Sequence, residues 1–147
     1  MNELTKILSK YNIPVDIEKI IAEKNIKVDK YCVDLNDDEK GRLNKDKDGY
    51  TMQIGALRHL YEKRYIMAKF LFEITEKEKC QNEFANKILM PEALMEEIID
   101  NTDIFDKDGD VNLILLDCLF KRFQVPKKIL YARLKEIWDK KNFQKKS

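Results

Sequence analysis

The sequence is poor in the residues on which most small catalytic sites depend. Its 147 residues include 1 histidine, 4 glycines, 3 prolines and 3 cysteines. One imidazole excludes every mechanism that needs two, including that of the ordinary zinc-peptidase helix, and we expect His59 to be a surface or partly packed side chain. The sequence has no glycine-rich phosphate loop, no G-x-S-x-G turn and no Walker lysine. We therefore expect no cofactor.

Disulfides, long apolar runs and a dominant charge are also lacking. The cysteines, Cys32, Cys80 and Cys118, are odd in number and form no C-x-x-C pair, which argues against a disulfide framework. No apolar run is long enough to span a membrane, and the first residues lack the apolar core of a secretory signal. The charge is nearly balanced, at 28 basic and 27 acidic residues, so no overall field attracts nucleic acid or an anionic membrane. We expect a cytoplasmic protein without a membrane partner.

The spacing of apolar residues predicts an α+β fold that is mostly helical. Helical periodicity covers residues 3–11, 16–24, about 56–74, 80–89, 91–99, 111–123 and the stretch from 126 onward. Residues 31–35 read as a strand, and Asp48-Gly49 between two alternating runs predicts a hairpin, so we expect three antiparallel strands. No linker divides the chain, which predicts a single domain over residues 1–147. Its parts would be N-terminal helices (1–30), the sheet (31–55), central helices (56–100) and a C-terminal helix pair (110–140).

The central helix carries two charges in an otherwise apolar segment. Between residues 65 and 74 only Lys69 and Glu73 are not apolar. They lie four residues apart and so share one face of a helix. A helix that is apolar nearly all round is buried, where charges are costly. We therefore expect these two residues to form a structural ion pair supported by tertiary contacts, or to mark a site that binds a partner.

Two acidic stretches resemble parts of calcium loops but lack their complete pattern. In residues 44–49 the position of the closing glutamate would be Gly55, and a strand pattern follows, so we expect a hairpin turn. In residues 106–110 the glycine is misplaced for the motif. This second stretch is expected to precede and cap the next helix.

The C-terminal region has the shape of a helix-turn-helix. Residues 116–137 form two helical patterns joined by a tight break at residues 124–126. Such a pair places its second helix in the major groove of DNA, and Lys127, Lys128 and Arg133 would supply positive charge there. The second helix is also amphipathic, so a packed helix hairpin without DNA contacts is the alternative.

Several of these segments resemble the ImmA/IrrE family of small zinc metallopeptidase domains, over roughly residues 10–140. Arg64-Tyr65-Ile66-Met67-Ala68 is similar to the family's R-F-T-[IL]-A sequence, which precedes its H-E-[LF]-G-H helix. Residues 82–91, Asn-x-Phe-Ala-x-x-Ile-Leu-Met-Pro, resemble N-x-F-A-x-x-L-L-M-P and are the most specific part of the likeness. Residues 114–137 resemble the family's C-terminal helices. The resemblance implies a zincin-like core followed by a helix-turn-helix-like pair.

The departures from the family pattern fall on the residues that carry its chemistry. In the family, two histidines one turn apart bind zinc, the glutamate between them is the general base, and a downstream acidic residue completes the ligand set. The matching positions here are Lys69, Phe70 and Glu73, and the downstream ligand position is Cys80 or the nearby Glu78. A protonated lysine repels zinc, and phenylalanine cannot accept a proton from water. The resemblance therefore implies a pseudo-active site without the family's metal ligands or catalytic residues.

Three functions follow as hypotheses. The first is a catalytically inactive peptidase-like domain that binds another protein. Because active family members cleave helix-turn-helix repressors, this partner would be such a repressor of a bacterial phage or mobile element, or another helical protein, bound without being cut. The second is a peptidase with an atypical metal site at Glu73, Cys80 and Glu78. The third is a DNA-binding protein that uses the C-terminal helix pair.

Overall fold

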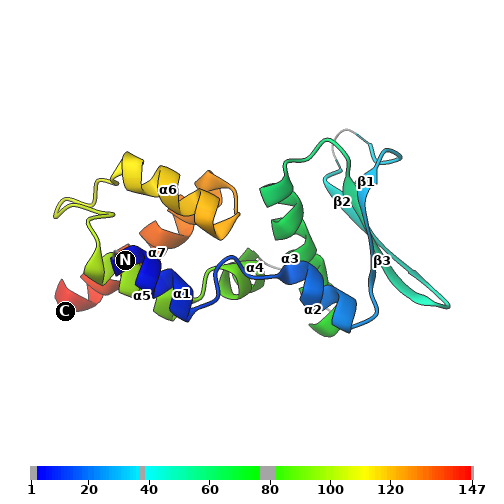
Figure 1. The fold of residues 1–147 in the computed structure, drawn as a ribbon, viewed down its shortest axis with the longest axis horizontal. Coiled ribbons are helices and arrows are strands. Elements are labelled where there is room, and N and C mark those ends of the chain that lie inside the picture. Colours follow the sequence, from blue (N-terminus) through cyan, green and yellow to red (C-terminus); the bar gives the residue numbers. More distant parts are fainter. Residues whose placement is uncertain (1–2, 37–38, 77–81, 147) are drawn as a thin grey trace. The chain divides into compact units, whose positions relative to one another are not determined.

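The structure, a computed structural model, describes residues 3–36, 39–76 and 82–146, with side chains up to residue 143. Within these ranges it is an α+β protein with seven helices and one three-stranded sheet (Figure 1). Its contacts divide the chain into two compact units. The sheet unit comprises Asp16–Ala85, and the helical unit comprises Met1–Val15 together with Asn86–Ser147. The expectation of a single domain stays a prediction.

The sheet unit combines one small sheet with the helices that precede and follow it. Its elements are α2 (Ile17–Glu23), β1 (Lys27–Cys32), β2 (Gly41–Asp46), β3 (Gly49–Gly55), α3 (Leu60–Glu76) and the first half of α4 (Asn82–Leu89). The strand order is β1-β3-β2, and β3 pairs in parallel with β1 and antiparallel with β2. The all-antiparallel sheet is therefore wrong, and the sheet is mixed. The pairing differs because β3 occupies the centre, a position that no local sequence pattern specifies.

The predicted hairpin between β2 and β3 is confirmed. Asp46 pairs with Gly49 across a two-residue turn. The N–H of Asp48 donates to Oδ1 of Asp46 at 2.8 Å, and Gly49 has a φ of 122°, which side chains larger than hydrogen disfavour. The acidic residues of this segment are thus explained by the chemistry of a turn.

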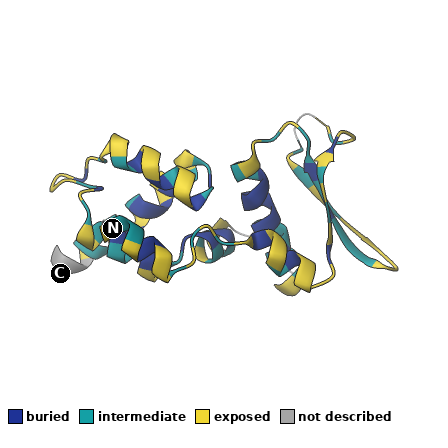
Figure 2. Ribbon diagram, viewed as in Figure 1, coloured by how far each residue is buried: buried dark blue, intermediate teal, exposed yellow. Residues whose placement is uncertain are grey.

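The helix α3 supplies much of the core of the sheet unit (Figure 2). It packs against β3 and α2, and its residues are buried without a gap from 63 to 68. Alternate residues of β3, Met52 and Ile54, are buried as well, as expected for a strand with one covered face. The prediction of a buried central helix is confirmed, although the helix begins at Leu60 rather than near residue 56.

The helical unit is formed by segments from both ends of the chain. It contains α1 (Glu3–Lys10), the end of α4, α5 (Glu92–Asn101), α6 (Leu113–Phe123) and α7 (Lys127–Lys146). α5 packs against α1 and α7, and α6 packs against α7. The buried apolar residues of this unit are Ile7, Leu8, Leu89, Met90, Leu94, Met95, Ile98, Ile104, Leu116, Leu119, Phe123, Val125, Leu130, Leu134 and Ile137. In the described ranges of the chain, no helix is long and apolar enough to cross a membrane.

The tight break between α6 and α7 is confirmed. Gln124 adopts the left-handed conformation that ends many helices, with a φ of 56°. At the other end of α6, the side chain of Asn112 accepts a backbone N–H of the first turn at 3.1 Å. The acidic residues 106–110 do not cap this helix, because Asp106 accepts two backbone N–H groups of its own loop. The expected capping role of that stretch is therefore wrong.

Candidate functional site

The first turn of α3 is held by the only histidine of the sequence. Nδ1 of His59 accepts the N–H of Tyr61 at 3.1 Å, and the carbonyl of His59 accepts the N–H of Lys63 at 2.9 Å. His59 is therefore the N-cap residue, which satisfies donors that a helix start leaves unpaired. The side chain is exposed, as expected. Its capping role was not foreseen, because histidine is not among the preferred N-cap residues.

Lys63 is a buried cation on α3, with only 5% of its surface exposed. Its Nζ donates to the carbonyl of Lys30 at 2.5 Å and lies 4.4 Å from the centre of the Tyr31 ring. The register between β1 and β3 shifts between Asp29 and Cys32, and such a shift removes residues from the regular ladder. Lys63 thus supplies a donor to a backbone acceptor in the irregular part of β1.

Arg64, the next residue of α3, is buried as well, with 7% of its surface exposed. Burial lowers the pKa of its guanidinium, and the charges of Asp16 and Glu18 act in the opposite direction. Both acidic residues lie at the start of α2, where Asp16 is the N-cap. The charge of Arg64 therefore contributes to the packing of α3 against α2.

Lys69 and Glu73 are only half-buried. In the part of the chain that the structure describes, no ion pair joins them. The expected structural ion pair is thus not formed. The reason is that the uninterrupted run of buried residues on α3 ends at Ala68, and beyond it only Leu71 is buried. Side chains that retain contact with water do not need a partner of opposite charge.

Phe70 lies directly against the sheet. A Cβ atom added to Gly41 would be 2.9 Å from Cε2 of Phe70 and 3.0 Å from Cγ2 of Ile66. Only glycine allows such a close approach of a helix to a strand, so the first residue of β2 and the ring of Phe70 fit each other. The residue that the resemblance aligns with a general base is therefore a packing side chain.

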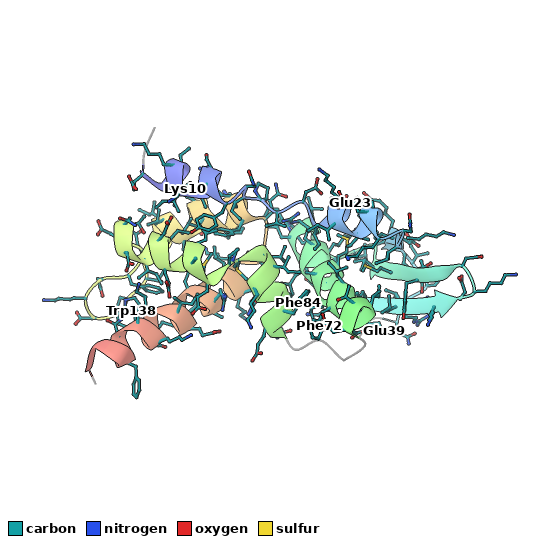
Figure 3. All side chains as sticks on the ribbon, turned by 90° about the horizontal axis from the view of Figure 1, so that it is seen from below. Lys10, Glu23, Glu39, Phe72, Phe84 and Trp138 are labelled. Carbon is teal, nitrogen blue, oxygen red and sulfur yellow. The ribbon has the colours of Figure 1, made fainter. Side chains whose placement is uncertain are left out.

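A second phenylalanine of α3 meets the following helix. The ring centres of Phe72 and Phe84 are 4.6 Å apart, with their planes tilted by 44° (Figure 3). Cys80 and Glu78, the predicted downstream ligand positions, lie outside the described residues. Among the residues that are described, no group of three or more histidine, cysteine, aspartate or glutamate side chains is arranged to hold a metal ion.

The sheet unit also exposes large apolar side chains at one end of its sheet. Tyr31, Val33, Leu57 and Leu60, here called the apolar surface, have 71%, 83%, 101% and 51% of their surface exposed. Because β1 and β3 are parallel, their C-terminal ends lie at the same end of the sheet. The N–H of Ala56 donates to the carbonyl of Cys32 at 2.9 Å, which joins the two segments there.

A hollow of about 460 Å³ adjoins the apolar surface, and the residues that line it include Val33, Leu35, Leu57 and Arg58. The sequence pattern does not reveal this surface, because it predicts Val33 inside a strand and Leu57 at the start of a helix. Only the parallel pairing of β1 with β3, which brings both residues to one end of the sheet, shows that they are neighbours.

Of the three basic residues considered for DNA binding, two are exposed and one is buried. Lys127 and Lys128 are exposed at the start of α7, and Lys127 forms an ion pair with Asp117. Arg133 has 6% of its surface exposed, and its Nε donates to the carbonyl of Met90 at 3.2 Å. Arg133 thus satisfies a carbonyl at the end of α4. As packed, it is not available to a phosphate group.

In the described part of the chain, the residues of the predicted pseudo-active site therefore do not form one common site. Phe70 packs against the sheet, Lys69 and Glu73 stay half-buried on α3, and Cys80 is not among the described residues. The likeness to the ImmA/IrrE family rests on the residues quoted for it alone, since no protein-family model, no curated protein and no solved structure matches the chain.

Proposed function

We propose that this chain is a catalytically inactive, metallopeptidase-like domain that acts as a protein-binding regulator in the cytoplasm. Its partner is a helix-turn-helix repressor of a phage or mobile element, bound without being cut. In this proposal the sheet and α3 form a zincin-like core, α6 and α7 form a helix-turn-helix-like pair, and the whole chain is one domain.

The observation that carries the proposal is the packing of Phe70 on Gly41. A general base must reach a water molecule and hold its proton, and a phenyl ring pressed against a strand does neither. The neighbouring positions support the same conclusion. Lys69 brings a positive charge to the place where the family pattern has its first metal ligand, and Glu73 alone is a poor ligand set for zinc.

The partner experiment mixes the purified full chain with a helix-turn-helix repressor and follows co-elution together with the intact mass of the repressor. The expected result is a stable complex in which the repressor remains uncut. A repressor that stays both intact and unbound would contradict the proposal. A repressor that is cut would favour the alternative, a peptidase with an atypical metal site that includes Glu73 and Cys80.

A metal measurement separates these two outcomes independently of any partner. The protein is purified without chelator, and zinc, manganese and iron are quantified per chain. We expect much less than one metal ion per chain. One ion per chain that is lost in Glu73→Gln would support the atypical metal site.

DNA binding through α6 and α7 remains the second candidate, because basic side chains are exposed on both sides of the break between these helices. They are Lys121, Arg122, Lys127 and Lys128. An affinity for duplex DNA that falls with salt, and falls further in Lys127→Gln/Lys128→Gln, would support it. Arg133→Ala is the wrong test, because this side chain is buried in the helical unit.

A further inference from the structure

We infer that the loop of residues 105–111, here called the strap, is held against α7 by the positive charge of Lys135 and detaches when that charge is lost. The strap belongs to the connection between α5 and α6, and its Gly109 lies against Trp138 of α7. Detachment uncovers the ring of Trp138 and changes the hollow beside it. This conformational device lies within the helical unit and does not depend on the proposed function.

The strap is closed on itself by backbone pairing. Phe105 and Val111 form an antiparallel bridge at its base, and the N–H of Asp106 donates to the carbonyl of Asp110 at 3.0 Å. The carboxylate of Asp106 accepts two further N–H groups of the strap, at 2.8 and 2.9 Å. None of these bonds involves α7, so the strap can leave α7 as a unit without breaking them.

Lys135 is the side chain of α7 that holds the strap. Its Nζ donates to the carbonyl of Gly109 at 3.3 Å. The same atom lies 4.4 Å from the centre of the Trp138 ring and 5.6 Å from the centre of the Phe105 ring, where the face of an aromatic ring attracts a cation. It is also 3.6 Å from Oδ1 of Asp139. One ammonium group thus connects the backbone of the strap, two rings and a carboxylate of α7.

Gly109 allows the backbone of the strap to rest directly on α7. A Cβ atom added to Gly109 would be 2.8 Å from Cη2 of Trp138 and 2.9 Å from Nζ of Lys135. The φ of Gly109 is 86°, a conformation that side chains disfavour. The closed position is therefore defined by the contact of one glycine with these two side chains.

The charges of the strap explain why a cation holds it. Residues 106–110 include three aspartates and one lysine, so the strap is net negative. Asp139, on the adjoining turn of α7, is negative as well, whereas Lys135 is positive. Without the charge of Lys135, the strap and Asp139 would carry charges of the same sign, which repel each other.

The strap also forms part of the wall of a hollow of about 330 Å³. This hollow is lined by Lys107 of the strap and by Trp138, Asp139, Asn142 and Phe143 of α7. When the strap detaches, Lys107 leaves this wall and more of the Trp138 ring meets solvent. The charge of Lys135 thus sets the shape of the hollow.

The test uses Trp138 as a reporter, because it is the only tryptophan of the sequence (Figure 3). Acrylamide quenching of its fluorescence measures how far the ring is uncovered. Brief digestion of the full chain with trypsin, followed by mass analysis, measures cleavage after Lys107. Lys135→Met retains the length of the side chain without its charge. In this variant quenching is expected to rise about twofold and cleavage after Lys107 about tenfold, since a hydrogen bond and two cation–π contacts are lost.

Matched variants separate the charge from other effects. Lys135→Arg retains the charge and is expected to keep both measurements within about twofold of those of the original chain. Lys128→Met, at the exposed start of α7, is the control and is expected to change neither. Gly109→Ala is expected to detach the strap with Lys135 intact, because its methyl group would overlap the Trp138 ring.

Salt provides a test that needs no substitution. A rise from about 0.05 M to about 0.5 M salt shortens the range of charge interactions. It is therefore expected to increase quenching of Trp138 in the original chain and to leave quenching in Lys135→Met unchanged. Quenching in the original chain that does not depend on salt would overturn the inference, even if a variant fails to fold.

The inference is also overturned if Lys135→Met is quenched and cleaved like the original chain. The same holds if Lys135→Arg detaches the strap as fully as Lys135→Met, because the charge would then not be what holds it. If cleavage at tryptic sites outside the strap rises equally, the substitution unfolds the whole helical unit and the inference fails. Unchanged quenching in Gly109→Ala would reject the direct contact between the strap and Trp138.

Discussion

Each of the two units contains a buried cation that donates to a backbone carbonyl. In the sheet unit, Lys63 donates to the carbonyl of Lys30 at the irregular step of β1. In the helical unit, Arg133 donates to the carbonyl of Met90 at the end of α4. Both carbonyls are at places where regular secondary structure leaves an acceptor without a partner. Lys63 and Arg133 thus each supply a hydrogen-bond donor to a backbone carbonyl that regular secondary structure leaves unpaired.

The two cations differ in how their charge is balanced. Arg133 also donates to the carboxylate of Glu136 at 3.3 Å, so it retains a counter-charge at the surface. Among the described residues Lys63 has no carboxylate partner, and its ammonium group lies over the Tyr31 ring, which is a weaker form of compensation. The planar guanidinium serves two acceptors at once, whereas the lysine serves one.

The largest expected effect is that of Arg133→Ala. The substitution leaves the Met90 carbonyl without its donor inside the core and removes the packing of the long side chain. We expect a loss of about 3 kcal/mol in the free energy of unfolding, measured with urea. Arg122→Ala, on the exposed side of α6, is the control and should change it by less than about 0.5 kcal/mol. Equal effects of the two substitutions would refute the role assigned to Arg133.

Lys63→Met is expected to cost less, about 2 kcal/mol. Methionine fills similar space but leaves the Lys30 carbonyl unsatisfied, and removal of a buried charge offsets part of that loss. The exposed Lys19 of α2 provides the matched control, Lys19→Met. If Lys63→Met costs as much as Arg133→Ala, the number of acceptors served does not explain the difference between the two cations.

His59→Ala tests the N-cap of the same helix that carries Lys63. The loss of one N-cap hydrogen bond is expected to cost about 1 kcal/mol. His59→Asn should retain most of the stability, because asparagine is a preferred N-cap residue. Hydrogen exchange of the first amides of α3 is the measurement, and exchange at the same rate in both variants would contradict the capping role.

Local sequence patterns were enough to predict most of the helices and the hairpin. The spacing of Leu130, Leu134 and Ile137 defines the buried face of α7, and all three are buried. The expected hairpin forms, with its turn at Lys47-Asp48 and with Gly49 as the first residue of β3, and the chain breaks at Gln124 as predicted. In each of these cases the physical cause lies within a few residues of the pattern that reveals it.

Apart from the position of β1, the features that escaped prediction depend on residues that are distant in sequence. β1 runs over Lys27–Cys32, whereas the prediction placed it at residues 31–35, because the charged side chains of Lys27, Asp29 and Lys30 obscure its strand pattern. The apolar surface requires knowledge that β1 and β3 are parallel. The burial of Arg133 depends on Met90, 43 residues earlier. No local pattern contains these pairings, so the candidate site was predicted less well than the fold.

Lys69→Ala is expected to change the free energy of unfolding least, and this substitution contrasts most directly with Lys63→Met. Both lysines are on α3, but Lys69 is half-buried and forms no ion pair with Glu73. A charge that water already solvates contributes little to folding, so we expect the free energy of unfolding to change by less than about 0.5 kcal/mol. A loss of about 2 kcal/mol or more would mean that Lys69 pairs with Glu73 in solution, and the distinction between buried and solvated cations on α3 would then fail.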